Sequence, residues 1–337
     1  MIRYILIRIV WLIPVIILVS FIVFTLMELA PGTALDIIIA QAEDLSEEER
    51  ITLLRQYNLD RPMVYRYGLY MFNLIQGDLG VGDVTRTPVW DTFISRLPNT
   101  LILAFSSLII GVIIAIPLGI VAARHAGTLG DNAVTVFTLV GMSMPLFWVG
   151  LLLLLQFSLR WPIFPSGTFD NGVRSLILPA LCGSFTLMAN AARQTRSNML
   201  EVLKADFLRT ARAKGVPEEA VIRKHALGNA WIPIITAVGS SLATQLAGSV
   251  VIEQVFTWPG IGRMAAEAVR ARDVTTTTGV VIMTTILYVL VQLTVDVLYA
   301  FVDPRIKAQY LNYGKRKKRA PKPVSIPAAA TAGGADV

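Results

Sequence analysis

Six apolar runs alternate with polar segments along this chain of 337 residues. A run of about 20 residues with few charges is long enough to cross the hydrocarbon core of a bilayer as a helix. The pattern therefore predicts an all-α, polytopic membrane protein with six transmembrane helices. A proline in the third run, in Met144-Pro145, predicts a break that neighbouring helices can tolerate. The runs cover approximately residues 9–29, 100–123, 133–157, 176–192, 232–255 and 279–299.

The polar segments divide the chain into four parts. Residues 1–29 form the N-terminal span, and residues 30–98 an extracytoplasmic cap with a helix start at Ser46 and a further helix near 63–75. A five-span core covers residues 99–308 and includes a cytoplasmic loop, 196–231. The basic tail, 309–337, is rich in Ala, Pro and Gly at its end, which favours disorder.

The distribution of basic residues indicates which side each loop faces. The N-terminus, the second loop, the loop 196–231 and the tail hold 19 of the 30 Lys and Arg residues when Arg193, Arg305 and Lys307, which flank them, are included. Cytoplasmic loops carry such an excess, so both termini and the loop 196–231 are expected in the cytoplasm. The net charge of +7 follows from these loops and does not indicate nucleic-acid binding.

The loop 196–231 is the most polar long segment of the second half, and it reads as two short helices. Met199, Val202, Leu203 and Phe207 lie at helical spacing, which predicts one apolar face on a helix from about 199 to 215. Gly215 can end that helix in the left-handed conformation, and Pro217 can begin the next. A loop that merely anchors its flanking spans is the alternative.

The residues of this loop resemble a known family. Thr210-Ala-Arg-Ala-Lys-Gly215, followed by His225-Ala-Leu-Gly-Asn229, is similar to the coupling loop of binding-protein-dependent ABC importer permeases. Gly228 and Trp231 depart from the family pattern. In the family the first helix of the loop docks into a groove on an ATPase subunit. The resemblance implies an ATPase-coupling role for Phe207, Arg209, Thr210, Ala211, Arg212, Lys214, Gly215 and His225.

Other segments resemble the dipeptide/oligopeptide/nickel branch of this family. In that branch a segment like Glu253-Gln-Val-Phe-Thr-Trp-Pro-Gly-Ile-Gly262 closes the fifth span on the extracytoplasmic side. An interfacial turn held by Trp258 and Pro259 is the alternative. Arg272-Asp273 matches a family pair, but the next four residues, Val274–Thr277, depart from the family pattern. The outer-gate residues implied are Glu253, Phe256, Trp258, Pro259 and Gly260. Further branch motifs are Ala30-Pro-Gly32, Leu59-Asp-Arg-Pro62, Gly77-Asp-Leu-Gly80 and Arg96-Leu-Pro-Asn-Thr100.

Polar side chains inside apolar runs are candidates for lining a transport pathway, because exposure to lipid is costly for them. Asn190 and Gln245 are the best candidates, with hydrogen bonds between helices as the alternative. Glu28 and Asp296 lie near the ends of spans and could simply reach water.

The sequence offers no catalytic constellation and no Walker A motif, so we expect a transport subunit and not an enzyme. A lone Cys182 excludes a disulfide within the chain. The two histidines lie far apart without other ligands at suitable spacing, so no metal site is expected. Gly77–Gly82 is not a phosphate loop, because no Lys-Ser/Thr follows it.

The resemblance covers about residues 1–308 and implies the first of two permease subunits with the type I importer fold. It implies a second homologous permease subunit, two ATPase subunits that bind ATP and magnesium, and an extracytoplasmic substrate-binding protein. It also implies the cell membrane of a prokaryote. Short peptides are the expected substrate, with nickel, glutathione or oligosaccharide as alternatives. An ion-driven secondary transporter and a non-transporting scaffold are the rival classes.

Overall fold

The computed structural model describes residues 2–30, 60–166 and 172–302, together with residues 48, 51, 52 and 55. Within these residues the regular elements are helices, and one isolated antiparallel bridge joins Val81 and Pro88. The all-α prediction is confirmed for this part of the chain. The helix start predicted at Ser46 and the tail 309–337 lie outside the described residues. The long helices are α1 (Ile2–Leu29), α5 (Val89–Arg124), α8 (Val173–Leu203), α11 (Leu227–Val255) and α13 (Val274–Val302).

Among the described residues, four helices are long and apolar enough to cross a membrane, namely α1, α5, α8 and α13. The third apolar run instead forms α6 (Leu129–Ser143) and α7 (Leu146–Leu154), which continues as the π-helix η1 (Leu155–Arg160). These two halves are bent by 102° and count as at most one further span. The bend lies at Met144-Pro145, as predicted, because Pro145 lacks an amide hydrogen and forces Met144 into the extended region.

The helix α5 begins at Val89, well before the span expected from Thr100. Pro88 precedes its first residue and Asp91 lies in its first turn, which are both favourable at a helix N-terminus. Residues 89–98 are too polar to belong to an apolar run, so hydropathy alone assigned them to the preceding segment. They lie instead on the same helix as the second run.

Small residues let α5 and α8 approach closely along most of their length. Ala104, Ser107, Ala115 and Ala122 of α5 are buried together with the glycines between them. A Cβ atom added at Gly119 would lie 2.6 Å from the carbonyl oxygen of Ala192, and one added at Gly111 would lie 2.3 Å from Leu187 Cδ2. Close backbone packing through small residues is a main source of helix association in membranes.

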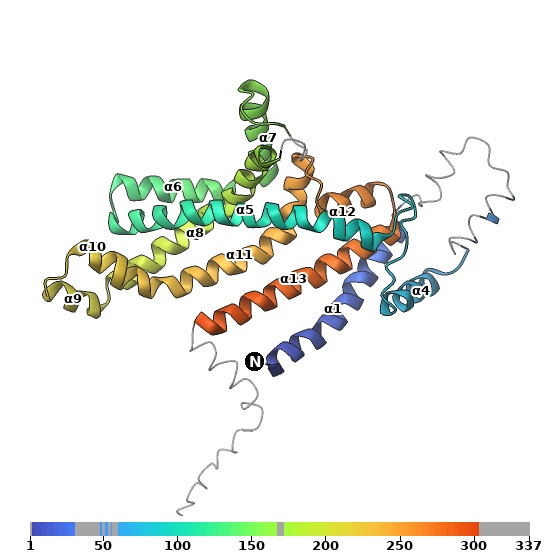
Figure 1. Ribbon diagram of the computed structural model, residues 1–337, viewed down its shortest axis with the longest axis horizontal. Helices are drawn as coiled ribbons and strands as arrows, with labels where there is room; N and C mark the ends of the chain where they lie inside the picture. Colours follow the sequence, from blue (N-terminus) through green and yellow to red (C-terminus); the bar gives the residue numbers. More distant parts are fainter. Residues whose placement is uncertain are drawn as a thin grey trace, which may run out of the picture.

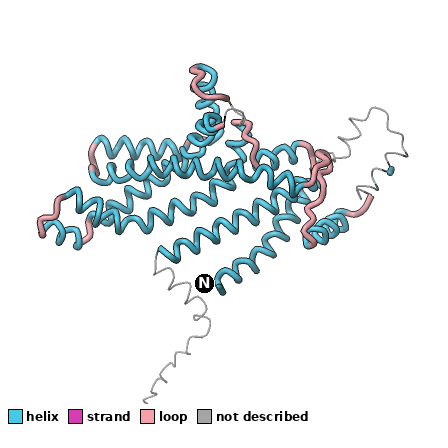
Figure 2. The backbone as a smooth tube through the Cα atoms, in the orientation of Figure 1, coloured by secondary structure: helices cyan, strands magenta, loops and turns pink. Residues whose placement is uncertain are grey.

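The helices are arranged with their short connecting elements at two opposite ends (Figure 1). One end carries α9 (Asp206–Ala213), α10 (Glu218–Ala220) and the π-helix η3 (Val221–Ala226). The other carries α4 (Met63–Ile75) and α12 (Ile261–Arg270). Figure 2 shows that the loops of the described residues gather at these ends and around α7.

Two carboxylates near span ends are engaged within the protein. Arg8 of α1 lies 2.6 Å from the carboxylate of Asp296 in α13. Glu28, at the other end of α1, pairs with Arg66 of α4. From the sequence, both acids could simply have reached water or bonded to another helix, and the structure places each of them in an ion pair between helices.

Candidate functional site

A polar hairpin, residues 204–226, connects α8 to α11 at one end of the molecule (Figure 1). Gly215 has a φ of +76°, the left-handed conformation predicted for the end of its helix. Pro217 directly precedes α10. The predicted pair of short helices is therefore confirmed. The continuous helix predicted from about 199 to 215 is wrong, because Ala205 is extended, with φ −71° and ψ 142°, and separates α8 from α9.

The hairpin is anchored by apolar side chains. Leu208 is fully buried with Met199 and Val221, and this cluster reaches Ala123 at the end of α5. Phe207, which we expected on the same face as Met199, is 46% exposed. The interruption at Ala205 changes the phase of α9 relative to α8, so Leu208 takes the inward position.

The opposite face of α9 is polar. The side chains of Arg209 and Asp206 are 80% and 96% exposed, and Thr210 and Lys214 also face outward. Arg212 donates two hydrogen bonds to the carboxylate of Glu218, at 3.0 and 2.8 Å. These bonds hold the pKa of Glu218 below its usual range and raise that of Arg212. Arg212 thus closes the hairpin.

The remaining coupling candidates lie at the edge of the anchored face. Ala211 is half-buried and packs against the Leu208 cluster. His225 is half-buried within η3, and its carbonyl oxygen accepts a hydrogen bond from Asn229. All eight predicted residues therefore belong to one hairpin, but they divide into an exposed group and a half-buried group, Ala211 and His225.

An ion pair that sequence reasoning missed lies beside the hairpin. Asp131, in the first turn of α6, has a side chain only 2% exposed and lies against Arg196 of α8. Arg196 Nη2 donates to Asp131 Oδ2 at 2.8 Å, and the amide of Gly127 donates to the same oxygen at 2.9 Å. A lone acid at the start of an apolar run, opposite an arginine at the end of another, was the signal available in the sequence.

The Glu253 turn, residues 253–263, forms the opposite end of α11. Glu253 is fully buried, and its carboxylate accepts hydrogen bonds from the Thr100 hydroxyl and the Arg263 amide, each at 2.8 Å. The Thr100 hydroxyl oxygen also accepts a hydrogen bond from the Ile261 amide at 2.9 Å. A Cβ atom at Gly260 would lie 2.4 Å from Glu253 Cδ. The glycine therefore makes room for the carboxylate.

The aromatic residues of this turn are packed inside the protein. Trp258 and Phe256 are both fully buried. The Trp258 indole donates to the Asn99 carbonyl at 3.0 Å, and the Asn99 amide donates back to the Pro259 carbonyl at 2.9 Å. Trp258 is thus not an interfacial anchor exposed to lipid headgroups within this chain. All five predicted outer-gate residues lie in one cross-linked turn, and their gating role stays a prediction.

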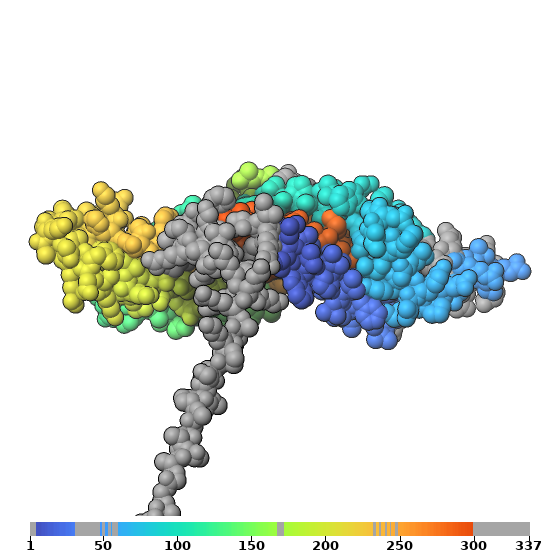
Figure 3. Space-filling model, turned by 90° about the horizontal axis from the view of Figure 1, so that it is seen from below, coloured from blue at the N-terminus to red at the C-terminus, as the bar shows by residue number. Residues whose placement is uncertain are grey.

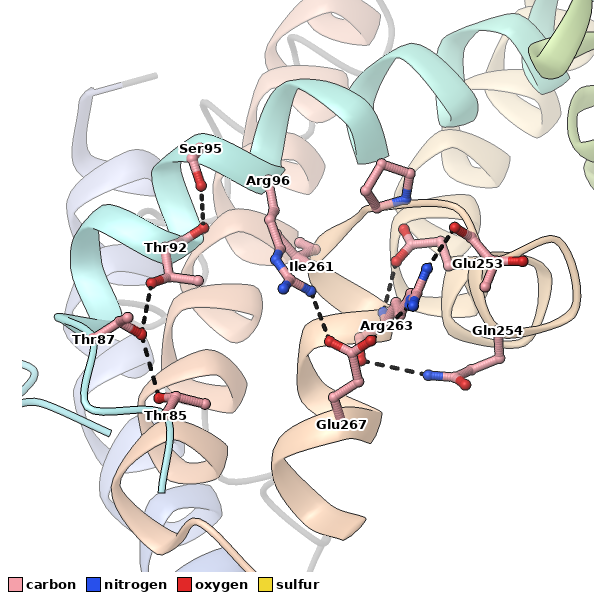
Figure 4. A network of polar contacts seen from close by, with 12 residues as sticks. Thr85, Thr87, Thr92, Ser95, Arg96, Glu253, Gln254, Ile261, Arg263 and Glu267 are labelled. Carbon is pink, nitrogen blue, oxygen red and sulfur yellow. Dashed lines mark hydrogen bonds and ion pairs between the residues drawn. The ribbon is translucent and has the colours of Figure 1, made fainter. Parts of the chain in front are cut away.

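Charged residues surround the turn. Figure 4 shows Glu267 between Arg96 and Arg263, which donate to its two oxygens at 3.0 and 2.7 Å. Burial by itself would raise the pKa of Glu267, but these two hydrogen bonds outweigh it and hold the pKa below its usual range. The network joins α5 to α12.

Two aspartates join the start of α13 to the loop before α5. Asp273 is fully buried and accepts hydrogen bonds from the amides of Val84 and Thr276, at 3.1 and 2.8 Å. Asp83 in turn accepts from the Thr275 amide at 3.1 Å. The segment that departs from the family pattern is therefore used to hold the loop 82–85. Burial raises the pKa of Asp83.

The two pathway candidates do not come together. Asn190 is exposed, and its amide donates to the Thr186 carbonyl of its own helix at 3.0 Å. Gln245 is half-buried and donates to the Gly183 carbonyl of α8 at 2.8 Å. Gln245 therefore makes the hydrogen bond between helices that was its alternative role, and Asn190 remains the better candidate.

Comparison with known proteins identifies the family. The family described as "Binding-protein-dependent transport system inner membrane component" matches residues 115–308. The oligopeptide transport system permease protein AppB of Bacillus subtilis is 36% identical over 318 residues, covering 91% of this chain and 100% of that protein. The chain belongs to this family of inner membrane transport components. The dipeptide transport system permease protein DppB of Escherichia coli K12 is 35% identical to this permease, covering 91% of this chain and 99% of that protein.

The fold of the permease is also found among solved structures. An inward-facing structure of the MetNI methionine ABC transporter matches it with a TM-score of 0.53 and 19% identity, covering 63% of this chain and 96% of that one. This permease is thus a multi-pass membrane protein and a transport subunit, and the family implies ATPase and substrate-binding partners. The matched family region contains the polar hairpin and the Glu253 turn, whereas α1 and α4 precede it.

Proposed function

We propose that this chain is one of two six-span permease subunits of a peptide importer that is driven by partner ATPases. The spans are α1, α5, the bent pair of α6 and α7, α8, α11 and α13. The basic polar hairpin and both termini lie in the cytoplasm, where loops rich in Lys and Arg are retained. The Glu253 turn then lies on the outer side. This topology places the cell membrane of a prokaryote between the two ends of the molecule.

The observation that carries the proposal is the construction of the polar hairpin. It presents Arg209 on the exposed face of α9 and Lys214 directly after that helix, whose other face is fixed by the buried Leu208. A short helix of this kind suits a groove on a partner. We assign that groove to an ATPase subunit, one for each of two permease subunits. ATP and magnesium bind to the ATPases, and this chain contributes no nucleotide site.

The contacts around the hairpin provide a route for coupling. Leu208 packs with Met199 of α8 and reaches Ala123 of α5. Arg124 at the end of α5 also lies 3.3 Å from Glu219 of α10. A displacement of α9 by closing ATPases therefore acts on both helices. Coupling requires that nucleotide and substrate favour different states of this same element.

The outer end supplies the second part of the mechanism. The Glu253 turn joins α5, α11 and α12, so a movement of α5 also moves the turn. We propose that the turn shapes the outer gate and that an extracytoplasmic substrate-binding protein delivers the substrate there. Asn190 is proposed to line the pathway, with Gln245 as the weaker candidate.

The proposed substrates are short peptides. The relatives AppB and DppB are named for oligopeptide and dipeptide transport. Nickel, glutathione and oligosaccharide remain the alternatives within the same transporter type, and each can be offered as a competitor of peptide uptake. A competitor that abolishes peptide uptake at a far lower concentration than unlabelled peptide would replace the peptide as the assigned substrate.

The test is ATP-dependent uptake of a labelled dipeptide into proteoliposomes that hold the complex with its co-purifying subunits. Gly215→Leu is compared with Gly228→Leu. Neither glycine has an atom within 4 Å of an added Cβ, but only Gly215 has a positive φ. Because left-handed backbone costs a residue with a Cβ about 1–2 kcal/mol, we expect uptake to fall about tenfold in Gly215→Leu alone.

The outcome distinguishes three roles for the hairpin. Loss of uptake with continued ATP hydrolysis in an assembled complex supports coupling. Loss of the ATPases from the purified Gly215→Leu complex supports docking and removes the evidence for coupling. Unchanged uptake means that the hairpin only anchors the spans, and uptake driven by an ion gradient without ATP would mean a secondary transporter.

A further inference from the structure

The helix α4 has an apolar face that does not suit a water-exposed cap. Arg66 is the only charged residue among its 13 residues, and its side chain is only 10% exposed. The exposed large side chains of the helix form one stripe, Val64 at 72%, Tyr65 at 55%, Leu69 at 38%, Phe72 at 62% and Ile75 at 82% exposed. A helix on an aqueous surface normally carries polar residues there.

The charged residues of α1 indicate the depth of α4 in the membrane. No charged residue lies between Arg8 and Glu28 of α1. These residues are 20 positions apart, which corresponds to about 30 Å along a helix and equals the thickness of the hydrocarbon core. Glu28 therefore marks the outer boundary of the hydrocarbon, and Ser20 lies about 12 Å inside it.

The contacts of α4 with α1 lie on the inner side of this boundary. The Tyr67 hydroxyl donates to the Ile17 carbonyl at 3.0 Å and lies 2.9 Å from the Ser20 hydroxyl. The Tyr67 ring meets Phe21 and Phe24 edge to face, with centroids 5.3 and 5.6 Å apart. Arg66 pairs with Glu28 at the boundary itself, which neutralises the only charge of the helix.

The apolar stripe of α4 continues the lipid-facing surface of α1. Leu18, Phe21, Ile22 and Leu26 of α1 are 60, 43, 46 and 62% exposed. Figure 3 shows the dark blue surface of α1 adjoining the lighter blue surface of α4. A side chain that belongs to the same surface and the same depth as a transmembrane span meets the same solvent.

We infer that α4 is embedded in the outer leaflet beside α1, with its stripe of Val64, Tyr65, Leu69, Phe72 and Ile75 packed against lipid acyl chains. Lipid is the occupant, because the stripe lacks charge and joins the exposed surface of a span. The helix anchors the chain between the outer segment and α5 at a fixed depth, and the opposite face of α4 packs Tyr70 between Phe24 of α1 and Ile282 of α13.

The depth of the stripe can be measured in the assembled complex in liposomes. In a Cys182→Ala background, Phe72→Cys is labelled with a small fluorophore, and Thr87→Cys, on an exposed loop at the same end, serves as the control. Ile75→Cys repeats the measurement at the end of the stripe. Nitroxides on lipid acyl chains and iodide in the water quench the fluorescence from opposite sides of the boundary.

We expect acyl-chain nitroxides to reduce fluorescence about twofold or more at positions 72 and 75 and little at 87, with iodide showing the reverse. Quenching by iodide at both 72 and 75 overturns the inference and places α4 in water. Protection from both quenchers also overturns it, because the stripe is then covered by protein, either the second permease subunit or the substrate-binding protein.

Discussion

The two ends of the permease are built on opposite principles. The polar hairpin keeps its charged groups outside and is fixed by apolar side chains around Leu208. The Glu253 turn keeps a carboxylate inside and is fixed by hydrogen bonds from Thr100 and Arg263. Apolar contacts are non-directional, whereas buried hydrogen bonds require fixed geometry. The hairpin can therefore shift as a unit, while the turn tolerates little displacement of its parts.

This difference agrees with the roles proposed for the two ends. A surface that docks on a moving partner needs accessible polar groups, and the contacts beneath it have to allow small displacements. A barrier at the outer face needs elements that move together. Substitutions at the two ends test this difference between apolar contacts and buried hydrogen bonds. Each substitution is compared with a control substitution at a matched residue.

The largest effect is expected for Gly260→Ala. The added Cβ would lie 2.4 Å from Glu253 Cδ inside a packed turn, and overpacking of this kind costs about 3 kcal/mol. The apparent Tm of the purified complex should fall clearly. Gly228→Ala is the control, since nothing lies within 4 Å of its Cβ position. Equal Tm values for the two variants would mean that the turn is compliant after all.

A more local effect, and so a smaller one on the Tm of the whole complex, is expected for Leu208→Ala. Truncation of a fully buried leucine costs about 3 kcal/mol, but the loss falls on one hairpin and not on the bundle. Amide hydrogen exchange should accelerate in α9 and η3 and stay unchanged in α5. Phe207→Ala is the matched control, because that side chain is 46% exposed. Faster exchange in Phe207→Ala than in Leu208→Ala would restore the apolar face expected from the sequence.

Asp131→Asn should weaken the link between α6 and α8 by about 2 kcal/mol, since a buried acceptor of charged hydrogen bonds is replaced by a neutral one. The control is Glu219→Gln, whose partly exposed pair with Arg124 is worth less than about 1 kcal/mol. A double-mutant cycle with Arg196→Gln measures the interaction itself. A coupling energy near zero would show that the pair is only geometrically close.

The smallest effect concerns pH. Because the pKa of Glu267 is held below its usual range, its pairing with Arg96 and Arg263 stabilises the folded state above about pH 4.3 and is lost as the pH falls through the lowered value. Glu267→Gln should lower Tm slightly at pH 7 and less at pH 3. At the hairpin, Glu218→Gln should lower Tm at pH 7 by less than Glu267→Gln does, because solvent screens the exposed pair of Glu218 with Arg212. A pH-independent difference for Glu267→Gln would exclude the charge as its cause.

Local signals in the sequence were sufficient for much of the fold. Gly215 and Pro217 end and begin helices as predicted, and Pro145 breaks the third run, because glycine permits a positive φ and proline restricts the backbone wherever they occur. The apolar runs located the helices, because a chain that crosses lipid has to be apolar and helical. These features depend on neighbouring residues alone.

Features that depend on pairing across the fold were not predicted. The sequence shows Asp131 and Arg196 near the ends of apolar runs but does not pair them, and it does not pair Asp83 with Thr275, since each pair is brought together only by helix packing. The extended residue Ala205 carries no distinctive local signal, so the inward role of Leu208 was missed. The buried state of Trp258 was missed for a related reason, because its partner Asn99 lies on another helix.

The continuous helix α5 reaches both ends of the permease, as α11 also does. It carries Asn99 and Thr100 at the Glu253 turn and Arg124 at the polar hairpin. Its 36 residues correspond to a rod of about 54 Å, and its close packing on α8 stiffens it. If such a rod pivots about its middle, a tilt of about 5° moves each end by about 2 Å in opposite directions. A push on the polar hairpin thus becomes a displacement of reversed sign at the Glu253 turn, with no intermediate that must unfold.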